Sequence, residues 1–492
     1  MPLPGVIYEE RDSAGVSGPP LDTATFFAGG LSQRGPVSKP VFISGASRYG
    51  SVLGEEFAPG YLYDAERIIR EEGGAGGWFI RCVGKAAAAS SGTLVDSGGL
   101  AALTVKAAQE GSLDPGVWGD DIDVEVTVSG ETFFTVIVKY REVQVEKETF
   151  STVADAVAWS QKSGYMVLAD GGHGKPKAQT LALTGGTDDR GSIVDADRIA
   201  ALALFTADLG PGQVLWPGAT TTAMHTALLQ HGQTHNRTPL LDGADTATVA
   251  TLTGEAATLR ALGNATARCG GMFAPWATVP GPAANQTKTI PYSIIQAGLC
   301  ARRDLETVDG TLGIGNPNDP AAGSWENAGV SRVATGLSQP AWTDAQRETL
   351  DDAGVSVVRV VYQRVITYGY RTLTNPVTDE LNVFLNNRRI DMAIIAAEEA
   401  IAEEFNFRQV DGRGHALSEL KSAIVSRVLQ PYLEIGALFE SKPGAEDAYS
   451  VDTSEQVNPV KQLAEGKVVV ETKAKRSPLA EQVVLRYVKE AL

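Results

Sequence analysis

The sequence predicts a multidomain α+β protein whose middle part is an α/β layer. The chain has 492 residues, which is enough for two to four domains. Short apolar segments alternate with helical stretches between residues 193 and 361, which is typical of an α/β layer. Residues 103–149 hold four β-rich segments with no helical stretch between them, so we expect a small separate β domain there.

Composition and charge exclude several classes of protein. A net charge of −17 leaves no basic face of the kind that binds nucleic acid, so we expect no nucleic-acid partner. No apolar run approaches the roughly 18 residues of a membrane span, so we expect no direct membrane insertion. Three cysteines, an odd and sparse number, indicate a reducing compartment. The N-terminus lacks the basic start and apolar core of a signal peptide, so we expect synthesis in the cytosol.

The chain divides into five predicted parts. Residues 86–99 are a linker-like run of Ala, Ser and Gly, and long helical patterns begin after Asn375–Pro376. The parts are an N-terminal extended arm at residues 1–20, the first part of a core at 21–90, an inserted β-rich domain at 91–190, an α/β middle domain at 191–374, and a C-terminal α+β domain with a terminal β arm at 375–492. In the last part we expect an amphipathic helix at 378–404 and a second helix at 416–429 that stops at Pro431.

Both ends of the chain contain strand-like segments without a local partner. These are residues 4–11 at the start, and residues 467–472 and 481–488, which are spaced like a hairpin, at the end. Exposed strands rich in Val and Tyr are edges that soluble proteins normally cover. Either they close a sheet within one subunit or they add strands to a neighbouring molecule. We favour the second alternative.

Three histidines, His225, His231 and His235, raise the question of a metal site. A zinc site of the HExxH type needs two histidines four residues apart on one helix and a glutamate base. Gly232 interrupts this segment and no glutamate accompanies it. We therefore expect surface or capping histidines and no metal.

Other motifs that suggest an enzyme are incomplete. The run GGHGKP at residues 171–176 has Pro176 where a phosphate-binding loop needs Ser or Thr. The run GASRY at residues 45–49 has Tyr49 where a serine-hydrolase elbow needs glycine. The acidic pairs at 398–399 and 403–404 are typical of a solvated helix face. No nucleophile, base and orienting group occur together, so we expect no catalytic residues.

Several segments resemble, in order, the tail sheath proteins of contractile phage tails and related contractile injection machines. In the first half these are PGVIYEE at residues 4–10, TFFAGG at 25–30, RGP at 34–36, the helix and WFIRCV strand within 65–83, LTVKA at 103–107, PGVWGD at 115–120 and LTGGTD at 183–188. In the second half they are GVSVVR at 354–359, YGYRTL at 368–373 and LNVFLNNRR at 381–389. Asp189, Ser356, Tyr370 and Asn387 depart from the residues usual in the family. The shared order extends over nearly the whole chain.

The resemblance implies a structural protein without a cofactor. Many copies would stack as helical rings around a rigid inner tube, and contraction would drive the tube through a cell envelope. The middle domain would resemble subtilisin in fold and lack its catalytic triad. The implied partners are further copies of the chain, the inner tail tube protein, and baseplate and tail terminator proteins. Assembly in the cytoplasm of a bacterial host would give part of a virion tail, which serves genome ejection, or of an injection particle.

The expected site residues follow from the strand-like ends and from this resemblance. The residues expected to exchange strands between subunits are Val6, Ile7, Tyr8, Glu9, Val468, Val470, Thr472, Val483, Leu485 and Tyr487. Lys421 and Arg427 are candidates for contact with the tube, although ordinary solvated charges explain them equally well.

Several alternatives to a phage tail sheath stay open. One is the sheath of a non-viral injection particle or tailocin, which the sequence does not separate from a phage sheath. Another is an α/β hydrolase, which would need a nucleophile elbow or a histidine and acid pair at the strand ends. A third is a surface-layer or adhesin-like protein, which would need a secretion signal.

Overall fold

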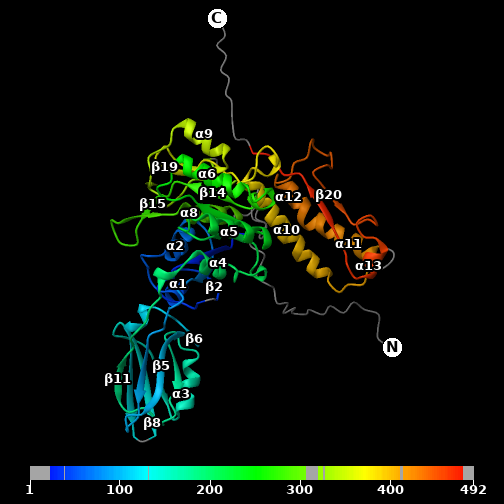
Figure 1. Cartoon of the computed structure of the whole chain (residues 1–492). Helices are drawn as coiled ribbons and strands as arrows, with labels where there is room; N and C mark the ends of the chain where they lie inside the picture. The colour runs from blue at the N-terminus through cyan, green and yellow to red at the C-terminus, as the bar shows by residue number, and fades with distance from the viewer. Residues whose placement is uncertain are drawn as a thin grey trace, which may run out of the picture.

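The computed structural model describes residues 23–37, 39–130, 132–305, 320–324, 327–410 and 414–479. The predicted N-terminal arm and the segment at 481–488 therefore lie outside the described residues. Figure 1 shows a central body, an elongated β-rich part that projects from it, and a C-terminal part of helices and a small ribbon beside it. Among the helices in the described ranges, none is long and apolar enough to cross a membrane.

The body is built on an eight-stranded sheet. Its strands in spatial order are β2 (Val41–Ile43), β3 (Gly77–Arg81), β1 (Phe26–Gly30), β12 (Gly212–Leu215), β13 (Arg237–Asp242), β14 (Gly271–Ala274), β18 (Val355–Val361) and β19 (Arg364–Thr367). The six inner strands run parallel, and the edge strands β2 and β19 are antiparallel. Parallel neighbours need crossover connections, which bring helices onto both faces. In agreement, β12, β13 and β14 are buried at every residue.

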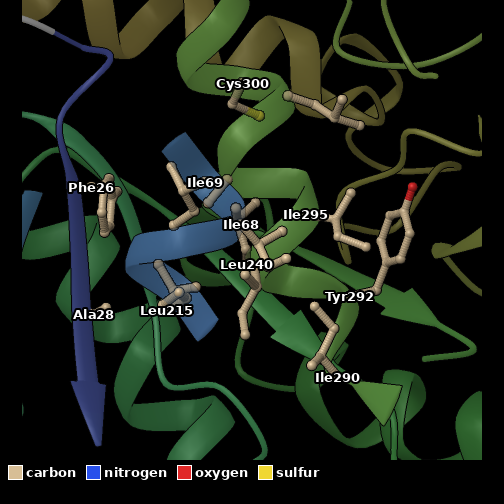
Figure 2. Packing of buried hydrophobic residues seen from close by; sticks show 14 of the residues in the cluster. Phe26, Ala28, Ile68, Ile69, Leu215, Leu240, Ile290, Tyr292, Ile295 and Cys300 are labelled. Atoms are coloured by element: carbon tan, nitrogen blue, oxygen red, sulfur yellow. The ribbon is translucent and has the colours of Figure 1, made fainter. Parts of the chain in front are cut away.

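Helices cover both faces of this sheet, so the predicted mixed α+β architecture is confirmed. One face packs against α1 (Ala46–Leu53), α2 (Leu62–Glu72) and α8 (Tyr292–Leu305), and Figure 2 shows this core. The other face packs against α4 (Asp195–Leu202), α5 (Thr222–Thr234), α6 (Val249–Arg260) and α9 (Asp344–Asp352). Every residue of α8 except Leu305 is buried, because protein surrounds this helix on all sides. A small sheet of β15 (Ala277–Pro280), β16 (Thr287–Ile290) and β17 (Gly336–Leu337) completes the body.

The projecting part contains two small sheets around one apolar core. The first sheet holds β4 (Ser91–Val95), β5 (Ala101–Gln109), β6 (Ser112–Leu113) and β10 (Met166–Asp170). The second holds β7 (Ile122–Ser129), β8 (Phe133–Tyr140), β9 (Val143–Phe150) and β11 (Gln179–Ala182), with α3 (Val153–Ser160) packed beside them. Buried residues alternate with exposed or half-buried ones along β8, as expected for a strand with one face on a core.

Buried charged side chains join the projecting part to the body. Arg81 at the end of β3 forms a fully buried ion pair with Asp114 (Nη1–Oδ1 2.6 Å), and Asp114 also accepts the Gly35 N–H at 2.8 Å. The Arg34 guanidinium lies 5.0–6.0 Å from the ring centroids of Trp118, Tyr140 and Tyr165. Because a buried charge needs its partners in place, these contacts fix the orientation of the two parts.

The C-terminal part packs helices and a two-stranded ribbon around a fourth core. Its elements are α10 (Leu385–Phe405), α11 (His415–Ile424), a π-helical turn (Val425–Leu429), α12 (Gln430–Glu434), β20 (Tyr449–Asp452), α13 (Val460–Ala464) and β21 (Glu471–Ala474). Tyr432 and Leu438 lie in this core together with Ile390 and Ile394 of α10. The ribbon therefore rests on the helices.

Two helix boundaries differ from those expected from the sequence. The first helix begins at Leu385 and not at residue 378, because the preceding residues turn around Asp379, whose carboxylate accepts from Thr374 at 2.8 Å and from Asn382 at 2.5 Å. The second helix does not stop at Pro431. The chain continues through the π-helical turn into α12, where Pro431 occupies the first turn and its missing N–H costs little.

A buried ion pair joins the body to the C-terminal part. Arg389 of α10 contacts Asp304 of α8, and neither side chain has exposed surface. Gln213 of β12 donates from Nε2 to Asp304 Oδ2 at 3.2 Å and to the Thr23 carbonyl at 3.1 Å. Thr23, where the described chain begins, is thus held beside the same pair. The sheet, α8 and α10 meet at this point.

We expect Arg389→Met to lower the free energy of unfolding by about 3–5 kcal/mol, because the Asp304 carboxylate would stay buried without its cation. Urea unfolding followed by tryptophan fluorescence measures this loss. The matched control is Arg427→Met, whose ion pair with Glu404 is about half exposed and should contribute far less to stability. Equal losses in the two variants would contradict the importance given to the buried pair.

Candidate functional site

The sheet of the body has a topological switch point, where ligands bind in many doubly wound α/β folds. After β1, the next parallel strand along the chain, β3, is added on one side of β1. The following strand, β12, is added on the other side, so the strand order reverses at β1. The depression at this point measures about 130 Å³. A Cβ atom on Gly29 would lie 2.2 Å from the Trp216 ring, so the indole fills the crevice. Sites for small molecules usually measure roughly 300–1,000 Å³, so this crevice is too small for a substrate.

A buried acid lies at the end of the next strand, β13. Asp242 accepts the Ser293 N–H at 2.8 Å and the Ser293 hydroxyl at 2.6 Å. Burial raises the pKa of Asp242 to about 6, and the hydrogen bonds from Ser293 offset part of that effect. Ser293 stands in the first turn of α8, where backbone N–H groups lack partners within the helix. Asp242 therefore acts as an anchor for the start of α8.

The histidines bind to neighbours inside the body. His225 is fully buried and its Nδ1 lies 2.7 Å from Glu255 Oε1. His231 Nε2 lies 2.9 Å from Arg237 Nη1, and burial together with the Arg237 charge lowers the pKa of His231 to about 3. The expectation of surface histidines is thus wrong for these two residues, since both side chains fill the space between α5 and its neighbours. In the described ranges, no group of three possible ligands could hold a metal ion.

The contacts of these side chains do not form a catalytic arrangement. The hydroxyl of Ser293 donates to a carboxylate, and no hydrogen bond joins it to His225, His231 or His235. The run at residues 171–176 forms a turn after β10, in which Asp170 Oδ1 accepts the Gly172 N–H at 2.7 Å. It precedes no helix, so it is not a phosphate-binding loop.

The C-terminal part offers an open strand edge. Within the described residues, β20 and β21 pair only with each other. Directly after β21, the backbone N–H of Lys475 donates to the Ala448 carbonyl at 2.8 Å. Backbone N–H and C=O groups alternate in direction along a strand. The backbone N–H and C=O groups of Thr472 and Ala474 therefore point away from β20. This edge has the geometry needed to accept a further strand.

A groove of about 590 Å³ lies beside the ribbon. Its walls come from the end of α5, from α7 (Asn264–Ala267), from α10 and from β21. Thr472 and Ala474 line it from the ribbon, and Ile395, which is 39% exposed, lines it from α10. Arg476 forms an ion pair with Asp391 and ties the chain after β21 to α10. The groove thus adjoins the strand whose outer edge is open.

The structure describes only some of the predicted strand-exchange residues. Thr472 lies in β21 and lines the groove, whereas Val468 and Val470 precede the strand and pack partly buried against the C-terminal core. Outside the described residues lie Val6, Ile7, Tyr8, Glu9, Val483, Leu485 and Tyr487.

The two candidates for tube contact differ in their surroundings. Lys421 is exposed on α11. Arg427 makes two hydrogen bonds to the Glu404 carboxylate, at 2.8 and 2.7 Å, so its charge is already compensated.

Sequence reasoning missed the residues of the groove wall. Arg268 follows α7, whereas Arg388 and Asp391 lie on α10, so the two segments become neighbours only in the folded chain. The available signal was the pair Arg388–Arg389 near the start of an apolar helix, where two charges need buried partners.

Solved structures of sheath proteins share this fold. A sheath tail protein from Desulfitobacterium hafniense matches with a TM-score of 0.59 and 15% identity, covering 91% of this chain and 93% of that one. A sheath tail protein from Listeria innocua matches with a TM-score of 0.62 and 13% identity, covering 92% and 95%. The contracted helical sheath of the anti-feeding prophage matches with a TM-score of 0.55 and 15% identity over 100% of both chains. No protein-family model and no curated protein matches the sequence. The predicted resemblance is therefore confirmed at the level of the fold.

We expect Asp242→Asn to stabilise the protein at pH 7. The folded-state pKa of Asp242 is about 6 against an ordinary value of 3.8, so this group favours folding below pH 4 and loses that contribution as the pH rises through 6. Asparagine keeps partners for both Ser293 groups and carries no titrating proton. The gain should reach up to about 3 kcal/mol at pH 7 and vanish near pH 4. Urea unfolding of both proteins between these pH values measures it, and a less stable variant at pH 7 would contradict the raised pKa of Asp242.

Proposed function

We propose that this chain is a structural subunit of a contractile sheath, whose copies stack as helical rings around an inner tube and contract to drive the tube through a cell envelope. The observation that carries the proposal is the open β21 edge beside a groove, on a fold shared with sheath tail proteins over most of the chain. An open edge is a liability unless a partner covers it. Another copy is the simplest partner, because head-to-tail contacts that do not close build helical assemblies.

Strand exchange would hold neighbouring copies together. In this proposal Val6, Ile7, Tyr8 and Glu9 form a donated strand. Thr472 belongs to the accepting ribbon, and Val468 and Val470 support it from the segment directly before β21. Val483, Leu485 and Tyr487 would form a further strand of the sheet made by the donated strand and the accepting ribbon. Main-chain hydrogen bonds between strands do not depend on the orientation of the domains that carry them. The lattice could therefore shorten by rigid-body rotation of the bodies while the arms stay paired, and this needs no cofactor.

We also propose a division of the chain into five parts. We assign residues 1–20 to an arm, 21–90 and 191–374 to a core with a subtilisin-like middle domain, 91–190 to an inserted domain and 375–492 to the tube-facing domain. We assign no catalytic activity to the core. The Trp216 ring in the crevice and the separate partners of Ser293 and His225 support this assignment.

The proposed partners are further copies, the inner tail tube protein, and the baseplate and tail terminator proteins. Lys421 is the better candidate for contact with the tube, because the Arg427 charge is paired with Glu404. We propose assembly in the cytoplasm of a bacterial host, as part of a virion tail or of a non-viral injection particle. Neighbouring genes would separate these two origins, since capsid and terminase genes accompany the first and toxin genes the second.

We expect Thr472→Pro to abolish assembly, because proline removes a backbone N–H from the open edge of β21. Thr472→Val is the matched control, since it keeps this N–H and a β-branched side chain. Sedimentation and negative-stain electron microscopy measure the fraction of assembled protein. Deletion of residues 1–11 should have the same effect as the proline. Normal tubes from the proline variant or from the truncated chain would refute strand exchange at this edge.

A further inference from the structure

The β18–β19 hairpin carries an exposed patch of aromatic and basic side chains. It forms one edge of the eight-stranded sheet, where Figure 1 shows the label β19. Tyr362 at its tip is 95% exposed and Tyr368 is 57% exposed. The Arg359 guanidinium lies 4.2 Å from the centroid of the Tyr368 ring, and Arg364 follows the tip. We call Arg359, Tyr362, Arg364 and Tyr368 the hairpin patch.

The tip of this hairpin is not optimised for folding. Tyr362 and Gln363 have φ angles of 48° and 64°, as in a two-residue turn that strongly favours Asn-Gly. A bulky residue in the left-handed region is an outlier, and such outliers often mark functional positions. The Tyr362 ring hardly packs against the described part of the chain, since the side chain is almost fully exposed. Its place at the tip is thus explained better by a contact outside the subunit.

The guanidinium groups of the hairpin patch also lack a carboxylate partner among the described residues. Neither Arg359 nor Arg364 forms an ion pair in the described part of the chain, and Arg364 Nη1 contacts Asn327 Oδ1 at 3.3 Å. The chain as a whole has a net charge of −17, so two arginines on one hairpin without a carboxylate partner in the described residues are unusual here. Tyrosine and arginine are the residues that contribute most often to binding energy at protein interfaces.

A further strand does not fit along most of this edge. Ser331 donates its N–H to the Val365 carbonyl at 3.0 Å, and Thr367 donates to the Gly329 carbonyl at 2.9 Å. The segment before β17 thereby covers the outer side of β19. A partner would therefore contact the hairpin through its side chains, in contrast to the open edge of β21.

A complementary surface lies on α10. Glu399 and Glu403 are exposed and stand one helical turn apart, and neither forms an ion pair in the described residues. Burial and the Glu403 charge both raise the pKa of Glu399. Two like charges at this spacing repel each other, and a cation from outside would relieve the repulsion. Glu399 also lines the groove beside β21, so this surface adjoins the proposed strand-exchange site.

We propose that the hairpin patch docks against Glu399 and Glu403 of a neighbouring copy of this chain. The proposal rests on the proposed function, because it places a second contact beside the strand-accepting groove. Strand exchange connects copies through the backbone, whereas this contact depends on complementary charges. This contact is therefore sensitive to salt, and it fixes how the body of one copy is oriented against the next copy.

Charge reversal tests the contact. We expect Arg359→Glu with Arg364→Glu to raise the protein concentration needed for self-association roughly tenfold or more, as measured by analytical ultracentrifugation. Adding Glu399→Arg and Glu403→Arg to the same chain should restore association. The matched control is Arg48→Glu on α1, an exposed arginine that also forms no ion pair in the described residues. It should associate like the parent.

A second variant separates folding from contact. Tyr362→Asn with Gln363→Gly supplies the preferred turn, so its thermal midpoint should equal or exceed that of the parent while its self-association weakens. Parent-like association of both this variant and the charge-reversed variant would overturn the hairpin contact. A different result would overturn the sheath proposal alone: the parent protein would associate through the patch but form no tubes. A parent that stays monomeric at every salt concentration would overturn both.

Discussion

The arrangement of the described parts of the chain depends on the buried ion pair between Arg389 and Asp304. Neither side chain is exposed, and Gln213 links the pair to β12 and to Thr23, where the described chain begins. The neighbouring Arg388 donates to the carbonyls of Gly232 and Arg237 at 3.2 and 3.0 Å, which fastens α10 to the end of α5. Two residues after Arg389, Asp391 forms an ion pair with Arg476, which follows the ribbon. One helix therefore connects the sheet, the start of the described chain and the open strand edge.

The polar groups of the body are used internally. Asp242 anchors the start of α8, Glu255 holds His225, and Trp216 fills the crevice where a related fold could bind a ligand. The surfaces left available lie elsewhere, at the outer edge of β21 and at the tip of the β18–β19 hairpin. The projecting β domain is held by Arg34, Arg81 and Asp114, so it would move together with the body. Among the described residues, these open surfaces therefore lie away from the crevice of the sheet.

Local patterns predict much of this fold, because apolar spacing distinguishes a strand from a helix without knowledge of the partner. The alternation of strands and helices, the β-rich insertion and the amphipathic character of α10 were all visible in this way. Sheet order was not, because Phe26 pairs with Gln213, nearly two hundred residues later, and no local feature encodes that choice. The same limit explains the errors about the histidines, which depend on Glu255 and Arg237. It also explains why the sequence did not reveal that β21 pairs with β20, or that Glu404 compensates Arg427.

Cryo-electron microscopy of the purified protein across a range of salt concentrations tests the proposed sheath function most directly. We predict hollow helical tubes in which a strand from a neighbouring copy runs beside Thr472 and Ala474, on the side of β21 that faces away from β20. Globular particles alone under all conditions, or tubes in which this edge of β21 is bare, would contradict the proposed function.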